Sequence, residues 1–118
     1  MEEQLVKNNI SDDVLSDFIV DRTLKIKGVN SFAKGLTANL TNSLLGKEFL
    51  HDNGVRISRK EDRIFVDINI IVNYGAKIPQ LAWEIQKQVS KSAKERLNVT
   101  IEEINIHVQG VSLPGGDK

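Results

Sequence analysis

The feature that most constrains the fold is the apolar period in the C-terminal half of the chain. Between residues 64 and 72 every second residue is apolar, which is the period of a β-strand with one buried face. These residues are Ile64, Val66, Ile68, Ile70 and Val72. A shorter alternation, Val55 and Ile57, comes before them, and the polar run 58–63 lies between. Together the two segments predict a β-hairpin.

After Tyr74-Gly75, which predicts a turn, the apolar period becomes that of a helix. Apolar residues recur three and four positions apart, and Pro79 fits a first helical turn, where a missing N–H costs little. The stripe consists of Ile78, Leu81, Ala82, Ile85, Val89 and Ala93. We therefore expect an amphipathic helix from about residue 77 to 97, followed by a final strand over 99–111.

The N-terminal half carries weaker patterns. Residues 5–10 fit a short edge strand, and Ser11 then supplies a helix N-cap, followed by two aspartates that favour the positive end of the helix dipole. We expect a helix from there, with Val14, Leu15, Phe18 and Ile19 facing the core, that closes at Gly28. Leucines and Phe32 at every fourth position favour a second helix within 30–53 that ends near Gly46.

These elements predict an α+β fold: a small mixed or antiparallel sheet with helices packed on one face, in the approximate order β-α-(α)-β-β-α-β. We expect one domain over residues 1–118, ordered from 5 to 113, with a flexible tail at 114–118. If the apolar residues of the long strand pack under the helices, the other face of the sheet shows Phe65, Asp67, Asn69, Ile71 and Asn73 beside Asn105, His107 and Gln109.

Composition narrows the function classes. Sixteen basic residues balance sixteen acidic ones, so no overall field draws the chain to nucleic acid or anionic lipid. The absence of cysteine excludes a disulfide, a thiolate metal site and a cysteine nucleophile. The N-terminus lacks the features of a signal peptide, and no apolar run approaches the roughly 20 residues of a membrane helix. We expect a cytoplasmic protein.

The residues complete no catalytic or metal-binding constellation. His51 and His107 are the histidine bases that the chain offers, and His51-Asp52 has no further ligands to close a metal shell. A helix start and a solvated helix face explain the acidic series at 12, 13, 17 and 21. Neither 45–48 nor 74–77 completes a phosphate-binding loop. The sequence therefore predicts no enzyme, no cofactor and no metal site.

Two features remain as a candidate interaction surface. Trp83 lies about 140° from the centre of the apolar stripe on a helical wheel, so it should be exposed unless the N-terminal segment covers it. Exposed tryptophans are enriched at interfaces. The other feature is the open sheet face. The candidate residues are Phe65, Ile71, Trp83, Asn105 and His107. A basic hairpin over 56–63 leaves phosphate contact as an alternative, diluted by Glu61 and Asp62.

Three segments resemble the alkaline shock protein family of Gram-positive bacteria: INIIVNYG over 68–75, the Ile85-Gln86 pair in the helix, and INIHVQGV over 104–111. The resemblance covers roughly residues 5–113. The sequence departs from the family pattern after Val20, where small residues are usual. It implies a cytoplasmic protein of envelope stress and cell-envelope homeostasis, with no established catalytic residue or cofactor. Some members look like peripheral proteins recruited to the membrane by an integral partner, and some are encoded beside enzymes of fatty-acid metabolism.

The leading hypothesis is a non-enzymatic cytoplasmic protein of the envelope stress response that acts through protein–protein interaction. Its partner would be a small membrane-anchored protein, a lipid-metabolism enzyme or a second copy in a homo-oligomer, without nucleic acid and without direct membrane insertion. Any position at the membrane would come through the partner. The alternatives are a nucleic-acid-binding module that uses the basic hairpin, and a lipid-metabolism regulatory protein that holds a small ligand between helix and sheet.

Overall fold

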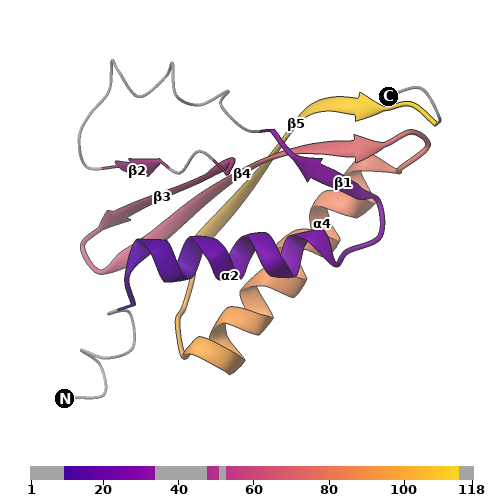
Figure 1. The fold of residues 1–118 in the computed structure, drawn as a ribbon. Helices are drawn as coiled ribbons and strands as arrows, with labels where there is room; N and C mark the ends of the chain where they lie inside the picture. Colours follow the sequence, from indigo (N-terminus) through magenta and orange to yellow (C-terminus); the bar gives the residue numbers. More distant parts are fainter. Residues whose placement is uncertain (1–9, 34–47, 51–52, 115–118) are drawn as a thin grey trace.

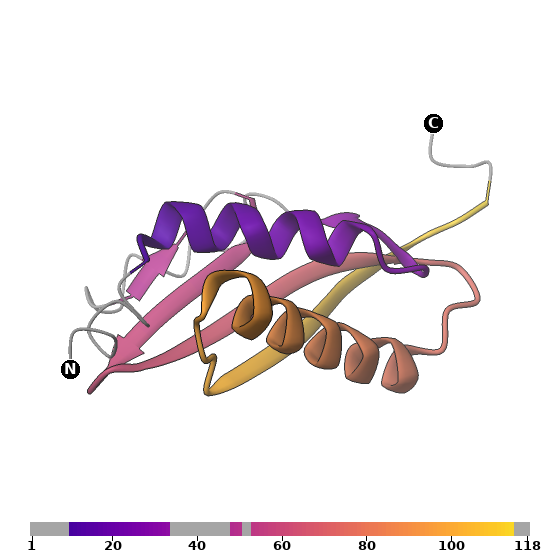
Figure 2. The ribbon, with the colours of Figure 1, turned by 90° about the horizontal axis from the view of Figure 1, so that it is seen from below.

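The computed structural model describes residues 10–33, 48–50 and 53–114. Two helices cover one face of a mixed five-stranded sheet (Figures 1 and 2). In chain order the elements are α2 (Asp12–Leu24), β1 (Val29–Phe32), β2 (Glu48–Leu50), β3 (Val55–Lys60), β4 (Arg63–Asn73), α4 (Ile78–Ser92), a π-helical segment (Ala93–Leu97) and β5 (Glu103–Ser112). The α+β class predicted from the sequence is confirmed, with the helices on one face as expected.

The long strand β4 is the centre of the sheet. Along one side, β3 pairs antiparallel with its first half and β1 with its second half, while β5 runs parallel along the other side. β2 extends the sheet by pairing antiparallel with β3. A parallel pair needs a long crossover, and α4 supplies it between β4 and β5. The sheet is therefore mixed, the first of the two arrangements that the sequence predicts.

The predicted hairpin is β3 and β4, joined by a turn at Glu61 and Asp62. Both residues have positive φ, 49° and 73°, as the two central residues of a tight hairpin turn require. The turn sets a register in which Ile57 faces Val66 and Arg56 faces Asp67. Side chains on the two strands therefore sort cleanly to the two faces of the sheet.

Helix α2 begins where the sequence predicts. Ser11 accepts a hydrogen bond from the backbone N–H of Val14 at 3.2 Å, which satisfies one free donor of the first turn. The helix ends at Leu24, and Gly28 (φ 109°) lies in the turn that follows. The placement of Val14 on the core face is wrong, because its side chain is 51% exposed while Leu15 is fully buried.

The second predicted helix is wrong where the structure describes it. Residues 29–32 form strand β1, because Val29 and Phe32 pack into the core against the second half of β4, which extends beyond the end of β3. Residues 48–50 form β2. Leucine spacing reports local periodicity only, and pairing with a distant strand overrides it. The rest of that segment, 34–47, and the predicted strand 5–10, except Ile10, lie outside the described residues.

The core lies between the inner face of the sheet and the two helices. The alternate apolar residues of β4, from Ile64 to Val72, are at most 1% exposed, as predicted. They pack with Leu15 and Ile19 of α2 and with the α4 stripe, Leu81, Ile85 and Val89. The α-helix ends at Ser92, and a π-helical segment continues to Leu97, where the sequence predicts the end of the helix.

Thr23 on α2 offers a stability test. Its side chain is fully buried, and Oγ1 has no hydrogen-bond partner among the described residues. An unpaired buried hydroxyl costs about 1–3 kcal/mol. Valine has the same shape and a similar helix propensity. Thr23→Val should therefore raise the free energy of unfolding by about 1 kcal/mol in urea denaturation. Thr23→Ser keeps the hydroxyl and should lower it. A valine variant less stable than wild type would contradict the assignment.

Candidate interaction surface

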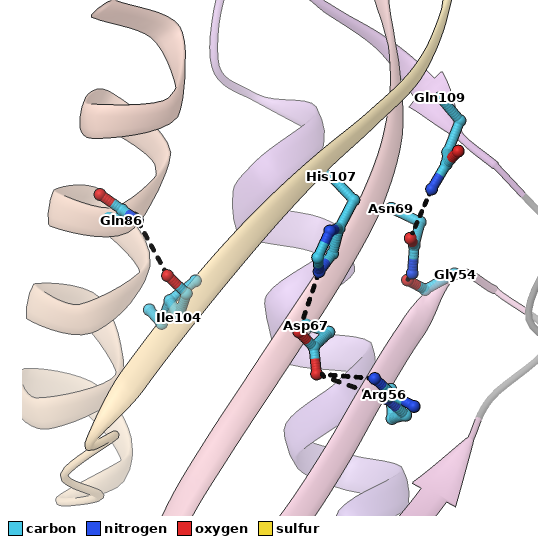
Figure 3. A network of polar contacts seen from close by, with 8 residues as sticks. All are labelled: Gly54, Arg56, Asp67, Asn69, Gln86, Ile104, His107 and Gln109. Atoms are coloured by element: carbon cyan, nitrogen blue, oxygen red, sulfur yellow. Dashed lines mark hydrogen bonds and ion pairs between the residues drawn. The ribbon is translucent and has the colours of Figure 1, made fainter. Parts of the chain in front are cut away.

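The outer face of the sheet, which points away from the helices, is organised around Asp67 on β4. One carboxylate oxygen contacts the guanidinium of Arg56 on β3, with Nη2 at 3.3 Å and Nε at 3.4 Å. The other lies 2.9 Å from Nε2 of His107 on β5 (Figure 3). The Asp67 side chain is only 16% exposed. It therefore ties three strands together rather than standing free for a ligand.

A second polar contact chain runs beside the first. The side-chain amide of Asn69 donates to the carbonyl of Gly54 at 3.0 Å, and its Oδ1 accepts a hydrogen bond from Nε2 of Gln109 at 2.9 Å (Figure 3). Asn69 is 5% exposed. The expectation that it stands on an open face is therefore wrong: the residue is buried, and its amide joins β4 to β5 and to Gly54, the residue before β3.

The four predicted candidates of the sheet face do lie together. Asn105 is the register partner of Asp67, and His107 is that of Asn69. Phe65 and Ile71 stand toward the two ends of this row on β4. His107 is exposed, with 46% of its side chain accessible, whereas Phe65, Ile71 and Asn105 are partly buried. The outer face thus offers His107 as its most accessible predicted contact, held in place by Asp67.

Trp83 is exposed as predicted, with 58% of its surface accessible. The Nζ of Lys87, one turn along α4, lies 4.7 Å from the centroid of the indole ring, a cation–π distance. Three residues beyond Trp83, Nε2 of Gln86 donates to the carbonyl of Ile104 on β5 at 2.8 Å (Figure 3). Because α4 packs on the inner face of the sheet, the structure does not bring Trp83 together with the outer-face residues.

Sequence reasoning missed the roles of Arg56, Asp67 and Gln109. A usable signal existed for the first two, because the two-residue turn fixes the hairpin register and sets opposite charges directly across from each other. For Gln109 there was none. It lies where the β4–β5 register shifts, after Val108, and an irregularity of that kind depends on how the two strands meet.

Half of the cations of the basic hairpin make contacts within the molecule. Arg56 pairs with Asp67, and Nη2 of Arg59 lies 2.9 Å from Asp12 Oδ1 and donates to the carbonyl of Ile10 at 2.7 Å. Two of the four cations in the predicted phosphate-contacting patch thus make internal contacts: Arg56 joins β3 to β4, and Arg59 joins β3 to the start of α2. No observation on the described residues favours nucleic-acid binding.

The described part of the chain contains no group of three or more histidine, aspartate or glutamate side chains that could hold a metal ion. The predicted pair His51-Asp52 falls outside the described residues. Within the same ranges, no helix combines the length and the apolar character needed to cross a bilayer.

Comparison with protein families gives one match over most of the chain. The model of the alkaline shock protein 23 family, described as having a cell envelope-related function, matches residues 1–113. The uncharacterised protein YloU of Bacillus subtilis is 33% identical over 82 residues, which cover 70% of this chain and 63% of YloU. The uncharacterised protein Spy1614 of Streptococcus pyogenes is 30% identical over 107 residues, covering 90% of this chain and 88% of that protein.

A third relative has a descriptive name. A stress response regulator gls24 homologue of Streptococcus pyogenes is 26% identical over 98 residues, which cover 82% of this chain and 54% of the homologue. The chain thus spans about half of that protein and less than two thirds of YloU.

Solved structures give a likeness of fold. A triple variant of the MamM C-terminal domain superposes with a TM-score of 0.52 at 17% identity, covering 83% of this chain and 93% of that domain. A zinc form of the same domain gives a TM-score of 0.51 at 13% identity, covering 83% and 84%. At such identities the likeness supports the α+β arrangement and nothing about function.

Proposed function

The chain belongs to the alkaline shock protein 23 family, whose described function is related to the cell envelope, and on this basis we propose a non-enzymatic role in the envelope stress response. The protein acts through protein–protein contacts. The name of the gls24 homologue, a stress response regulator, supports the stress-related part of the proposal.

Trp83 is the observation that carries the interaction part. A tryptophan that leaves 58% of its surface in water forgoes much of the free energy that burial of a large ring supplies. Lys87 covers the ring by a cation–π contact, which orients the indole without burying it. A rigid aromatic side chain held in one place is the type of anchor that dominates binding energy at interfaces.

The outer sheet face is the second contact surface of the proposal. The side chains of Asp67 and Asn69 form hydrogen bonds with neighbouring parts of the sheet, so the surface around them is already ordered before a partner binds. Binding to an ordered surface loses less side-chain entropy. A partner that reaches this face meets His107 first, with Phe65, Ile71 and Asn105 around it.

The partner belongs to one of three classes: a small membrane-anchored protein, a lipid-metabolism enzyme, or a second copy of this chain. The family resemblance supports the first two. We place the protein in the cytoplasm. We also treat residues 1–118 as one domain, which is supported by the described strands, since all belong to one sheet, and by the two described helices, which share its core.

The test is chemical crosslinking and affinity capture with tagged wild type, Trp83→Ala and Ile71→Asp. Truncating an anchor residue typically weakens an interface by about thirtyfold, so one of the two variants should lose the captured partner or the crosslinked dimer. Val14→Ala is the matched control, since Val14 is an exposed apolar residue on the other helix. Equal capture by wild type and both variants, or no partner and no self-association, would count against the proposal.

A further inference from the structure

Three segments far apart in the sequence meet at one end of the molecule. They are the turn between α2 and β1, the turn between β4 and α4, and the end of β5 (right side of Figure 1). The N–H of Asn73 donates to the carbonyl of Gly28 at 2.9 Å, and the N–H of Tyr74 donates to that of Ser112 at 3.0 Å. We call this end, formed by residues 24–28, 74–78 and 111–114, the tip.

The tip concentrates exposed apolar surface. Seven large apolar side chains are exposed in the described part of the chain, and five of them belong to the tip: Leu24, Tyr74, Ile78, Val111 and Leu113. Tyr74 is the most exposed of the seven, at 66%. A Cβ added to the neighbouring Gly75 would meet no atom within 4 Å, so the turn projects into open space. Five exposed large apolar side chains gathered at one end of the molecule point to a binding role.

The tip is also basic, although the whole chain is balanced. Its cations are Lys25, Lys27 and Lys77. Lys25 is paired with Asp21 at 3.2 Å, whereas neither Lys27 nor Lys77 forms an ion pair with another described residue. Both line an open groove of 690 Å³ between the two turns, with Tyr74 also on its wall and Glu84 as its acidic member. Two lysines therefore line the same groove as Tyr74, the most exposed of the apolar side chains.

We propose that the tip docks on a bilayer surface that contains anionic phospholipid. Lys27 and Lys77 contact lipid phosphates, while Tyr74 and the apolar side chains beside it enter the interfacial region. Aromatic residues with a polar end are favoured at that depth, and lysines near an anionic surface each add binding energy. The lysines complement the negative charge of such a bilayer, and the exposed apolar side chains suit its interfacial region, so the tip combines the two properties that hold peripheral proteins on anionic membranes.

This contact is peripheral and reversible, because a few side chains at the headgroup level give marginal membrane affinity. It modifies the expectation from the sequence that any position at the membrane comes through a partner. It also goes beyond the proposed function, since it uses neither Trp83 nor the outer sheet face. The two proposals can therefore fail separately.

The test is co-sedimentation of the full chain with vesicles of phosphatidylcholine alone or with phosphatidylglycerol at one part in four, at low and high NaCl. We expect binding to the anionic vesicles at low salt only, since salt screens exposed charges. One lysine near an anionic surface contributes about a fivefold factor, so Lys27→Glu with Lys77→Glu should weaken binding by at least about thirtyfold. Tyr74→Asp should weaken it as well.

The matched control is Lys60→Glu with Lys94→Glu, which makes the same change of net charge away from the tip and should retain most of the binding. Failure of wild type to bind, equal binding to both kinds of vesicle, or equal loss in the two double variants would overturn the proposal. Light scattering after gel filtration tests whether a second copy of this chain, and not a bilayer, binds the tip. A dimer that dissociates on Lys27→Glu with Lys77→Glu, while wild type ignores vesicles, would assign the tip to a second copy and also overturn it.

Discussion

Replacing Gly54 by alanine should lower the free energy of unfolding by about 3 kcal/mol. Gly54 has φ 99°, where a residue with a side chain is strained. A Cβ there would also lie 3.0 Å from the backbone oxygen of Asn69 and 3.0 Å from a ring carbon of Phe32. Neither neighbour can withdraw, because Phe32 is buried and the oxygen of Asn69 accepts the N–H of Ala33 at 2.9 Å.

The consequences reach the outer sheet face. The carbonyl of Gly54 accepts both the backbone N–H and the side-chain amide of Asn69, each at 3.0 Å, so a displaced Gly54 disturbs both bonds. Gly75→Ala is the matched control: Gly75 has φ 90°, but a Cβ added there would meet no atom within 4 Å. It should cost about 1 kcal/mol, from strain alone. Urea denaturation of both variants measures the difference, and equal losses would contradict the steric account.

Asp67→Ala should lower the free energy of unfolding by about 2–3 kcal/mol. The carboxylate is mostly covered and joins Arg56 to His107, so its removal deletes the contacts that link β4 to both neighbouring strands at this position. Asp67→Asn keeps the shape and one acceptor oxygen and should lose about half as much. Chemical denaturation of the three proteins gives these values.

A double-mutant cycle then isolates the contact with His107. Asp67→Ala and His107→Ala should be less than additive, because each removes the same interaction. Additive losses would show that Asp67 stabilises the sheet through Arg56 alone. The cycle also matters for function, since His107 is the most accessible of the predicted outer-face contacts and Asp67 fixes its ring.

Much of the C-terminal half was predictable because its signals are local. The two-residue period over Ile64–Val72 and the helical period over Leu81–Ala93 each indicate which side chains face the core. Ile78, which the predicted stripe also includes, is 40% exposed because it lies at the first turn of the helix, at the tip. Ser11 similarly marked the start of α2, because an N-cap acts within one turn. The exposure of Trp83 followed from the helical wheel. These inferences need no knowledge of where other segments lie.

The predictions were wrong where a segment distant in the sequence decides the secondary structure or the burial of a residue. Val29–Phe32 forms β1 because it pairs with the second half of β4. Asn69 is buried where its amide makes hydrogen bonds with Gly54 and Gln109. Val14 shows the same limit on a smaller scale. Its spacing fits the apolar stripe of α2, yet only the position of the helix on the sheet decides which edge of that stripe is covered.

The sequence by itself determined the element types of the C-terminal half, the class of fold, the family and the exposure of Trp83, because periodicity, caps and motifs are properties of neighbouring residues. The tertiary structure decided the rest. It alone placed Asp67 between Arg56 and His107, and the side-chain amide of Asn69 against the carbonyl of Gly54. It also brought the two lysine-bearing turns and the end of β5 to one tip. Those contacts join residues about 11 to 45 positions apart, and only the packing of the sheet and helices brings such residues together.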